Sequence, residues 1–130
     1  MEGKNLMEAK KVLIVEDDKS LQQLIKKLVE LRNATVTIVG SGKDANHILK
    51  EQKNRYDLVF LDLILPEVTG WDILETLRAN PKTKDTPVVI FTGAILSGKE
   101  QAKMLTKVSA IVEKSKFTLE AFNALLDRWL

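Results

Sequence analysis

Five short runs of aliphatic residues alternate with five stretches of helical periodicity, and no other feature of the sequence restricts the fold as strongly. The runs, which we predict to be strands, cover residues 12–15, 35–39, 58–66, 88–91 and 110–112. After each of them, apolar side chains recur every three or four residues, as on the buried face of a helix. Strands and helices that alternate in this way form right-handed crossovers, so the pattern predicts an α/β fold with one parallel sheet covered by helices on both faces. The first, third and fourth runs are apolar throughout and are therefore expected at the centre of the sheet.

Cap residues predict where several helices begin. Serine followed three residues later by Gln or Glu forms a capping box, which we expect at Ser20 with Gln23 and at Ser97 with Glu100. In the helix after Ser97, Leu105 is expected to face the core. These signals place one helix directly behind each strand.

The composition describes a protein of one domain. The 130 residues include 20 basic and 18 acidic side chains with a net charge of +2, scattered along the sequence, so no nucleic-acid-binding surface is expected. The absence of cysteine excludes disulfides, thiolate catalysis and cysteine metal sites. No apolar stretch approaches the roughly 20 residues that cross a bilayer. We expect a cytoplasmic protein without a membrane partner, with a leader over residues 1–10 and one domain over residues 11–130.

Polar residues follow four of the predicted strands at their carboxyl ends. Glu16 and Asp17 follow the first strand, Asp62 is expected where the third emerges, and Thr92 and Lys114 follow the fourth and fifth. The carboxyl ends of parallel strands meet at one edge of the sheet, where ligands bind in open α/β folds. Clustered carboxylates attract a hard divalent cation such as Mg²⁺. A hydroxyl and a cation beside them are suited to a phosphoryl group, and a carboxylate can itself be the nucleophile that forms an aspartyl-phosphate.

These residues, together with Pro66, Gly70 and Gly93, resemble the receiver domain of bacterial two-component response regulators, including the single-domain chemotaxis type. The resemblance covers residues 11–130 and implies a flavodoxin-like sheet in the strand order 2-1-3-4-5. It implies a signalling module that catalyses its own phosphorylation and dephosphorylation but is not a turnover enzyme. Its implied partners are a sensor histidine kinase or phosphotransfer protein and a downstream protein. No output domain follows Leu130 in this sequence, so output by protein contact is expected unless the chain is a fragment of a larger regulator, with no direct contact to nucleic acid.

The resemblance also implies a role for each site residue. Asp62 corresponds to the phospho-acceptor, and Thr92 and Lys114 correspond to the residues that bind the phosphoryl group. The implied metal ligands of Mg²⁺ are Asp17, Glu16, Asp62 and the backbone carbonyl of Ile64.

Three positions depart from the usual pattern of the family. Ser115 stands where a proline usually follows the lysine, and Ile111 stands where an aromatic switch residue is usual. Lys107 stands where glycine is common, so the preceding helix is expected to lack a glycine cap.

Three other classes of protein are alternatives to a phosphorylated receiver. A haloacid-dehalogenase-like phosphatase also uses an aspartate after a parallel strand, but it usually has a second aspartate where this chain has Ile64. A flavodoxin-like electron carrier would need a phosphate cradle where this chain has an acidic loop. A pseudo-receiver that acts as a scaffold without phosphorylation remains an alternative, although Asp62, Thr92 and Lys114 are all present.

Overall fold

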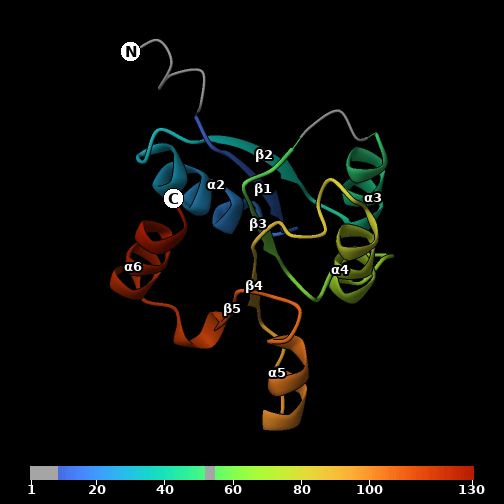
Figure 1. Cartoon of the computed structure of the whole chain (residues 1–130). Helices are drawn as coiled ribbons and strands as arrows, with labels where there is room; N and C mark the ends of the chain where they lie inside the picture. Colours follow the sequence, from blue (N-terminus) through green and yellow to red (C-terminus); the bar gives the residue numbers. More distant parts are fainter. Residues whose placement is uncertain (1–8, 52–54) are drawn as a thin grey trace.

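Five strands form one parallel sheet at the centre of the molecule (Figure 1). The computed structural model describes residues 9–51 and 55–130, so most of the predicted leader lies outside the described residues. The sheet has the order β2-β1-β3-β4-β5, which confirms the predicted order and the central places of the first, third and fourth strands. The strands are β1 (Lys11–Val15), β2 (Thr35–Val39), β3 (Leu58–Leu61), β4 (Val88–Thr92) and β5 (Ala110–Glu113).

Helices cover both faces of this sheet, as the alternating pattern predicts. The described part of the chain contains α2 (Lys19–Glu30), α3 (Gly42–Lys50), α4 (Gly70–Ala79), α5 (Gly98–Met104) and α6 (Leu119–Trp129), with a short 3-10 helix at Lys114–Lys116. Figure 1 shows α2 and α6 on one side of the sheet and α3 and α4 on the other.

Each face of the sheet has its own apolar core. On one face, Leu13 and Leu61 pack with residues of α3, α4 and α5, including Met104. On the other, Ile14 and Phe60 pack with residues of α2 and α6. Successive residues of β1 and β3 therefore point to opposite faces, and because both faces are buried these strands are apolar at every position.

Two predicted boundaries on the site side of the sheet were wrong. Helix α2 begins at Lys19 because the side chain of Asp18 accepts a hydrogen bond from the amide of Leu21, so the cap is Asp18 and not Ser20. Strand β3 ends at Leu61 and does not continue to Pro66. The amide of Asp62 still donates to the carbonyl of Val15 at 3.1 Å, and the chain beyond it is a loop.

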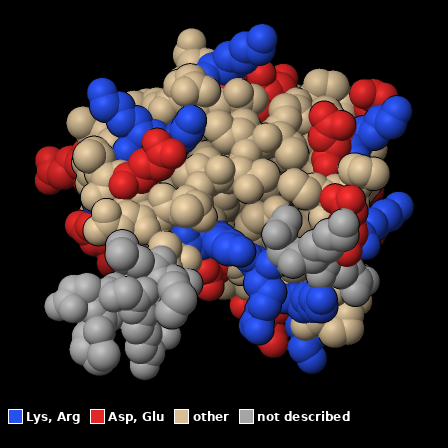
Figure 2. Space-filling view, turned by 90° about the horizontal axis from the view of Figure 1, so that it is seen from above, with Lys and Arg blue, Asp and Glu red and all other residues tan. Residues whose placement is uncertain are grey.

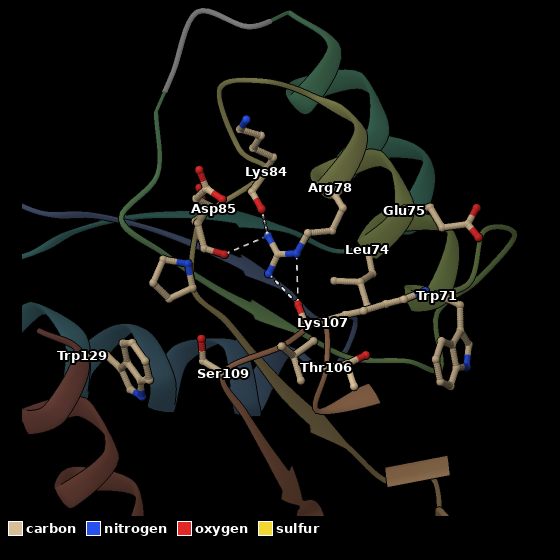
Figure 3. A pocket seen from close by; sticks show the side chains of 13 residues that line it. Trp71, Leu74, Glu75, Arg78, Lys84, Asp85, Thr106, Lys107, Ser109 and Trp129 are labelled. Carbon is tan, nitrogen blue, oxygen red and sulfur yellow. Dashed lines mark hydrogen bonds between the residues drawn. The ribbon is translucent and has the colours of Figure 1, made fainter. Parts of the chain in front are cut away.

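Helix α5 is shorter than predicted and has an unusual end. Its capping box at Ser97 and Glu100 is confirmed, but the helix ends at Met104, and Leu105 is 51% exposed where a core position was predicted. As expected, no glycine caps it. The chain after it is held by Arg78 of α4, whose guanidinium donates two hydrogen bonds to the carbonyl of Lys107, at 2.8 and 3.0 Å (Figure 3).

A hollow of about 760 Å³ lies beside this guanidinium, with Trp71 and Trp129 among its lining residues. The side chain of Arg78 also donates to the carbonyls of Thr83, Lys84 and Thr86 at 3.0–3.2 Å. It therefore ties α4 to the loop before β4 and to the loop after α5.

The surface carries charges of both signs. Seen from above Figure 1, basic and acidic side chains surround a central area of other residues (Figure 2). The lone histidine, His47, is exposed on α3. Among the described residues, no helix has the length and apolar character needed to span a membrane.

Candidate functional site

Three carboxylates meet at the carboxyl ends of β1 and β3, which are neighbours in the sheet. Val15 pairs with Leu61, so the residues that follow them, Glu16 with Asp17 and Asp62, leave the sheet side by side. One oxygen from each of these three carboxylates lies within 4.8 Å of the others. Glu16 and Asp62 are buried and Asp17 is exposed, so the cluster opens to solvent on the side of Asp17.

Lys114 bridges two of these carboxylates from the far edge of the sheet. Its ammonium lies 2.8 Å from Oδ2 of Asp62 and 2.9 Å from Oε1 of Glu16. It reaches them although Ser115 follows it, because the 3-10 helix that starts at Lys114 turns the chain directly after β5. The alkyl chain passes over Gly93, where a Cβ atom would lie 3.9 Å from Cδ of Lys114.

Burial and pairing act in opposite directions on the charges of this cluster. Burial raises the pKa of Glu16 above its ordinary value, although hydrogen bonds from the Asp18 amide and from Lys114 act in the other direction. Burial alone would lower the pKa of Lys114, but hydrogen bonds and charge attraction from Asp62 and Glu16 outweigh it and the pKa is raised. Lys114 therefore stays protonated at neutral pH, while the ionised form of Glu16 is held at a cost in free energy.

One backbone amide and the ammonium of Lys114 each hold one oxygen of the Asp62 carboxylate. The amide of Ile64 donates to Oδ1 of Asp62 at 3.0 Å, and Lys114 occupies Oδ2. Behind it, the first turn of α4 approaches so closely that a Cβ atom at Gly70 would lie 2.2 Å from the carbonyl oxygen of Asp62. Only glycine fits there, which explains the glycine that the sequence places just beyond the Asp62 strand.

Thr92 ends β4, the strand next to β3, and is fully buried. Its hydroxyl oxygen accepts a hydrogen bond from the amide of Ala94 at 3.1 Å. Ile64, on the loop after β3, is 59% exposed. The predicted site residues thus all lie at the carboxyl ends of four adjoining strands, β1, β3, β4 and β5. These residues are Glu16, Asp17, Asp62, Thr92 and Lys114.

The contacts that hold Glu16 could not be predicted from the sequence. Its Oε2 accepts from the amide of Asp18 at 3.0 Å, its amide donates to Val39 at 3.1 Å, and its carbonyl accepts from the side chain of Gln22. All three contacts use at least one backbone atom, which no side-chain pattern reveals. Gln22 lies one turn into α2.

The donor set suits a hard cation. Glu16, Asp17 and Asp62 offer carboxylate oxygens, which Mg²⁺ prefers, and Mg²⁺ commonly keeps several water molecules as its other ligands. The open side at Asp17 leaves space for such waters. The ammonium of Lys114 holds the two buried carboxylates together in the absence of a cation.

The comparison of the whole sequence with protein families decides the class. Residues 12–126 match the family described as the response regulator receiver domain. The chain belongs to this family. Response regulator ArlR of Staphylococcus saprophyticus is 39% identical over 82 residues, 63% of this chain and 35% of ArlR. Transcription factor SKN7 of Saccharomyces cerevisiae is 31% identical over 119 residues, 92% of this chain and 18% of SKN7. This receiver therefore spans about a third or less of these curated relatives.

Solved structures of receivers match the fold along almost its whole length. Chemotaxis response regulator CheY4 of Vibrio cholerae has a TM-score of 0.79 at 25% identity, over 94% of this chain and 99% of CheY4. The Mn²⁺-bound form of response regulator Rcp1 has a TM-score of 0.75 at 26% identity. The phosphorylated cyanobacterial phytochrome response regulator RcpA has a TM-score of 0.76 at 26% identity. Each of these two matches covers 92% of this chain and 90% of the other.

Proposed function

We propose that this receiver accepts a phosphoryl group onto Asp62 in a Mg²⁺-dependent reaction. The donor is the phosphohistidine of a sensor histidine kinase or of a phosphotransfer protein. The observation that carries the proposal is the setting of Asp62, whose carboxylate is buried 2.8 Å from the ammonium of Lys114 and within reach of two further carboxylates. A scaffold that is never phosphorylated has no need of this costly arrangement of buried charge.

The transfer uses groups that already surround Asp62. One carboxylate oxygen attacks the phosphorus atom, a P–O bond forms, and the P–N bond to the donor histidine breaks with its electron pair left on the imidazole nitrogen. Lys114 and the hydroxyl of Thr92 then hold the oxygens of the transferred group. Gly93 has no side chain of its own, which leaves room for the transferred group beside the alkyl chain of Lys114.

The carboxylates of Asp17, Glu16 and Asp62 and the backbone carbonyl of Ile64 are the proposed ligands of Mg²⁺. Bound there, Mg²⁺ would neutralise the charge that builds up between the phosphoryl oxygens and the carboxylates. The Mn²⁺-bound form of Rcp1 and the phosphorylated form of RcpA, both at 26% identity, support the binding of a divalent cation and the acceptance of a phosphoryl group.

The phosphorylated domain, residues 11–130, is proposed to signal by changing its affinity for a downstream protein. It then acts as a module with one phosphorylation per signal and not as an enzyme with turnover. Direct binding to nucleic acid or to a membrane is not part of the proposal.

Intact-mass spectrometry with acetyl phosphate tests this function. The protein should gain the mass of one phosphoryl group with Mg²⁺ and almost none in EDTA. Asp62→Asn should abolish the gain, whereas Asp57→Asn should keep it, because Asp57 is an exposed aspartate just before β3. An undiminished gain in Asp62→Asn would overturn the assignment, and no gain in the parent protein would favour the scaffold.

A further inference from the structure

We propose that Gln22 is a positioning residue for the magnesium site, acting through the backbone of Glu16 and Asp17. The inference rests on the proposed function, since it concerns the same cation. Gln22 lies in α2, is half-buried, and donates a hydrogen bond from its side-chain amide to the carbonyl oxygen of Glu16. No charge on Gln22 takes part, so its effect must come through geometry.

The carbonyl of Glu16 has little access to any other donor. Glu16 is 2% exposed, so water does not readily replace a lost partner there. Gly40, at the start of the loop after β2, lies against the same contact, because a Cβ atom built on it would be 3.6 Å from the Gln22 amide nitrogen and 3.9 Å from the Glu16 carbonyl oxygen. The carbonyl is thus enclosed by α2 and by this loop, and the peptide that it belongs to has one preferred orientation.

That peptide carries Asp17. Within residues 9–51 and 55–130, no side-chain hydrogen bond or ion pair holds the Asp17 carboxylate, which is exposed. Its position relative to Asp62 therefore depends on the backbone between Glu16 and Asp18. The Asp18 end is fixed by the cap, where Asp18 accepts from the Leu21 amide at 3.1 Å. The Glu16 end is fixed by Gln22.

The position of Gln22 predicts an effect on the affinity of the site for Mg²⁺. Mg²⁺ demands nearly octahedral ligands at short distances and binds weakly when a carboxylate is misplaced. Some groups do not bind the metal themselves but orient the residues that do. Removing such a group typically weakens metal affinity 10- to 100-fold. Loss of the Gln22 hydrogen bond should therefore weaken Mg²⁺ binding while leaving all three carboxylates in the sequence.

Calorimetric titration with Mg²⁺ alone, without a phosphoryl donor, tests this proposal. Gln22→Met keeps the size of the side chain and removes the donor, and it should raise the Kd for Mg²⁺ about tenfold. Gln22→Asn keeps the amide group on a shorter side chain that cannot reach the Glu16 carbonyl, and it should also raise the Kd for Mg²⁺. Gln23→Met makes the same change at the next, exposed position and should leave the Kd unchanged. All titrations are made at a temperature where circular dichroism shows each variant to be folded.

The result separates positioning from a role in stability alone. If Gln22→Met and Gln22→Asn lower the melting temperature in EDTA but bind Mg²⁺ with the parent's Kd, the proposal is overturned and Asp62 remains the proposed acceptor. As a second readout, the phosphorylation rate of Gln22→Met should fall at low Mg²⁺ and recover at saturating Mg²⁺. A deficit that persists at saturation contradicts the proposal. If the parent protein itself binds no Mg²⁺, the proposed function fails together with the inference.

Discussion

At the scale of single residues, the family resemblance implies that two apolar side chains flank the path to a phosphoryl group on Asp62. Ile64 lies two positions beyond Asp62 and is 59% exposed, and Ala94 lies two positions beyond Thr92. Hydrolysis of an aspartyl-phosphate needs a water in line with the bond to the carboxylate, and a polar side chain helps to orient it. Neither Ile64 nor Ala94 has a side chain that hydrogen-bonds water.

We therefore expect a long-lived phosphorylated form. A double variant, Ile64→Asn with Ala94→Glu, should lose its phosphoryl group roughly tenfold faster than the parent, which corresponds to about 1.4 kcal/mol of barrier. The measurement is the decay of the phosphorylated mass after acetyl phosphate is removed, in one Mg²⁺ buffer. Equal decay rates would show that these two residues do not control access of water.

Glu16 gives a prediction for pH. Because its pKa is raised in the folded protein, folding favours its protonated form, so its ionisation lowers stability as pH rises from its ordinary value of 4.5 through the raised value. Without Mg²⁺, Glu16→Gln should therefore be more stable than the parent at pH 7, and the difference should shrink as pH falls toward 4.5. Urea unfolding in EDTA across this range measures it. A difference that is constant or grows at low pH would contradict the sign.

Added Mg²⁺ provides the control for this prediction. A bound cation compensates the ionised carboxylate, so Mg²⁺ should raise the unfolding free energy of the parent more than that of Glu16→Gln.

At the scale of helices and loops, Arg78 is the main link between α4 and the chain around β4 and β5. Its guanidinium donates five hydrogen bonds to four backbone carbonyls. A lysine cannot reproduce this planar set of donors. Arg78→Lys should lower the unfolding free energy by about 2 kcal/mol, since carbonyls left without partners cost roughly 1–3 kcal/mol each. Arg128→Lys on α6, where the exposed guanidinium lies 5.5 Å from the Trp129 ring centre, should change it far less. Similar losses in both variants would contradict this role.

The loop between β4 and α5 should carry the signal outward. Thr92 is buried at the site, and the loop after it, residues 94–98, leads to α5 and past the exposed Ile95. Ile111 on β5 is half-buried against the core that α5 shares, so it can shift only slightly. On adding beryllofluoride, a phosphoryl mimic, NMR shifts should be largest at Thr92, in this loop and at β5. Changes confined to α2 would refute this route.

The strands and helices were largely predictable from the sequence. The spacing of apolar residues shows which side chains are buried, and burial of these side chains stabilises the elements. The ends of the elements were less predictable. Asp18 caps α2 where Ser20 was expected, since either residue type can cap a helix and only the path of the chain after β1 decides between them. Helix α5 ends early because Arg78, 29 residues before Lys107, holds the following carbonyl, and a contact at that separation leaves no local pattern.

At the scale of the whole molecule, the parallel sheet explains why the site residues could be chosen from sequence. The topology brings every strand's carboxyl end to one edge, so chemically matched residues at those ends must meet there. The supporting groups could not be chosen in this way. The Gln22 side chain donates to a backbone carbonyl, and Asp18 and Ile64 donate from their backbone amides. Every residue possesses such backbone atoms, so no sequence pattern marks these contacts.

The central claim is that the phosphoryl group resides on Asp62, and locating it by mass spectrometry tests this most directly. After reaction with acetyl phosphate and Mg²⁺, borohydride reduces an aspartyl-phosphate to homoserine, which marks the acceptor in a peptide digest. The account predicts homoserine at position 62, formed with Mg²⁺ and absent without it. Reduction at Asp17 or Asp57, or an unmodified position 62 in protein that has gained the phosphoryl mass, would contradict it.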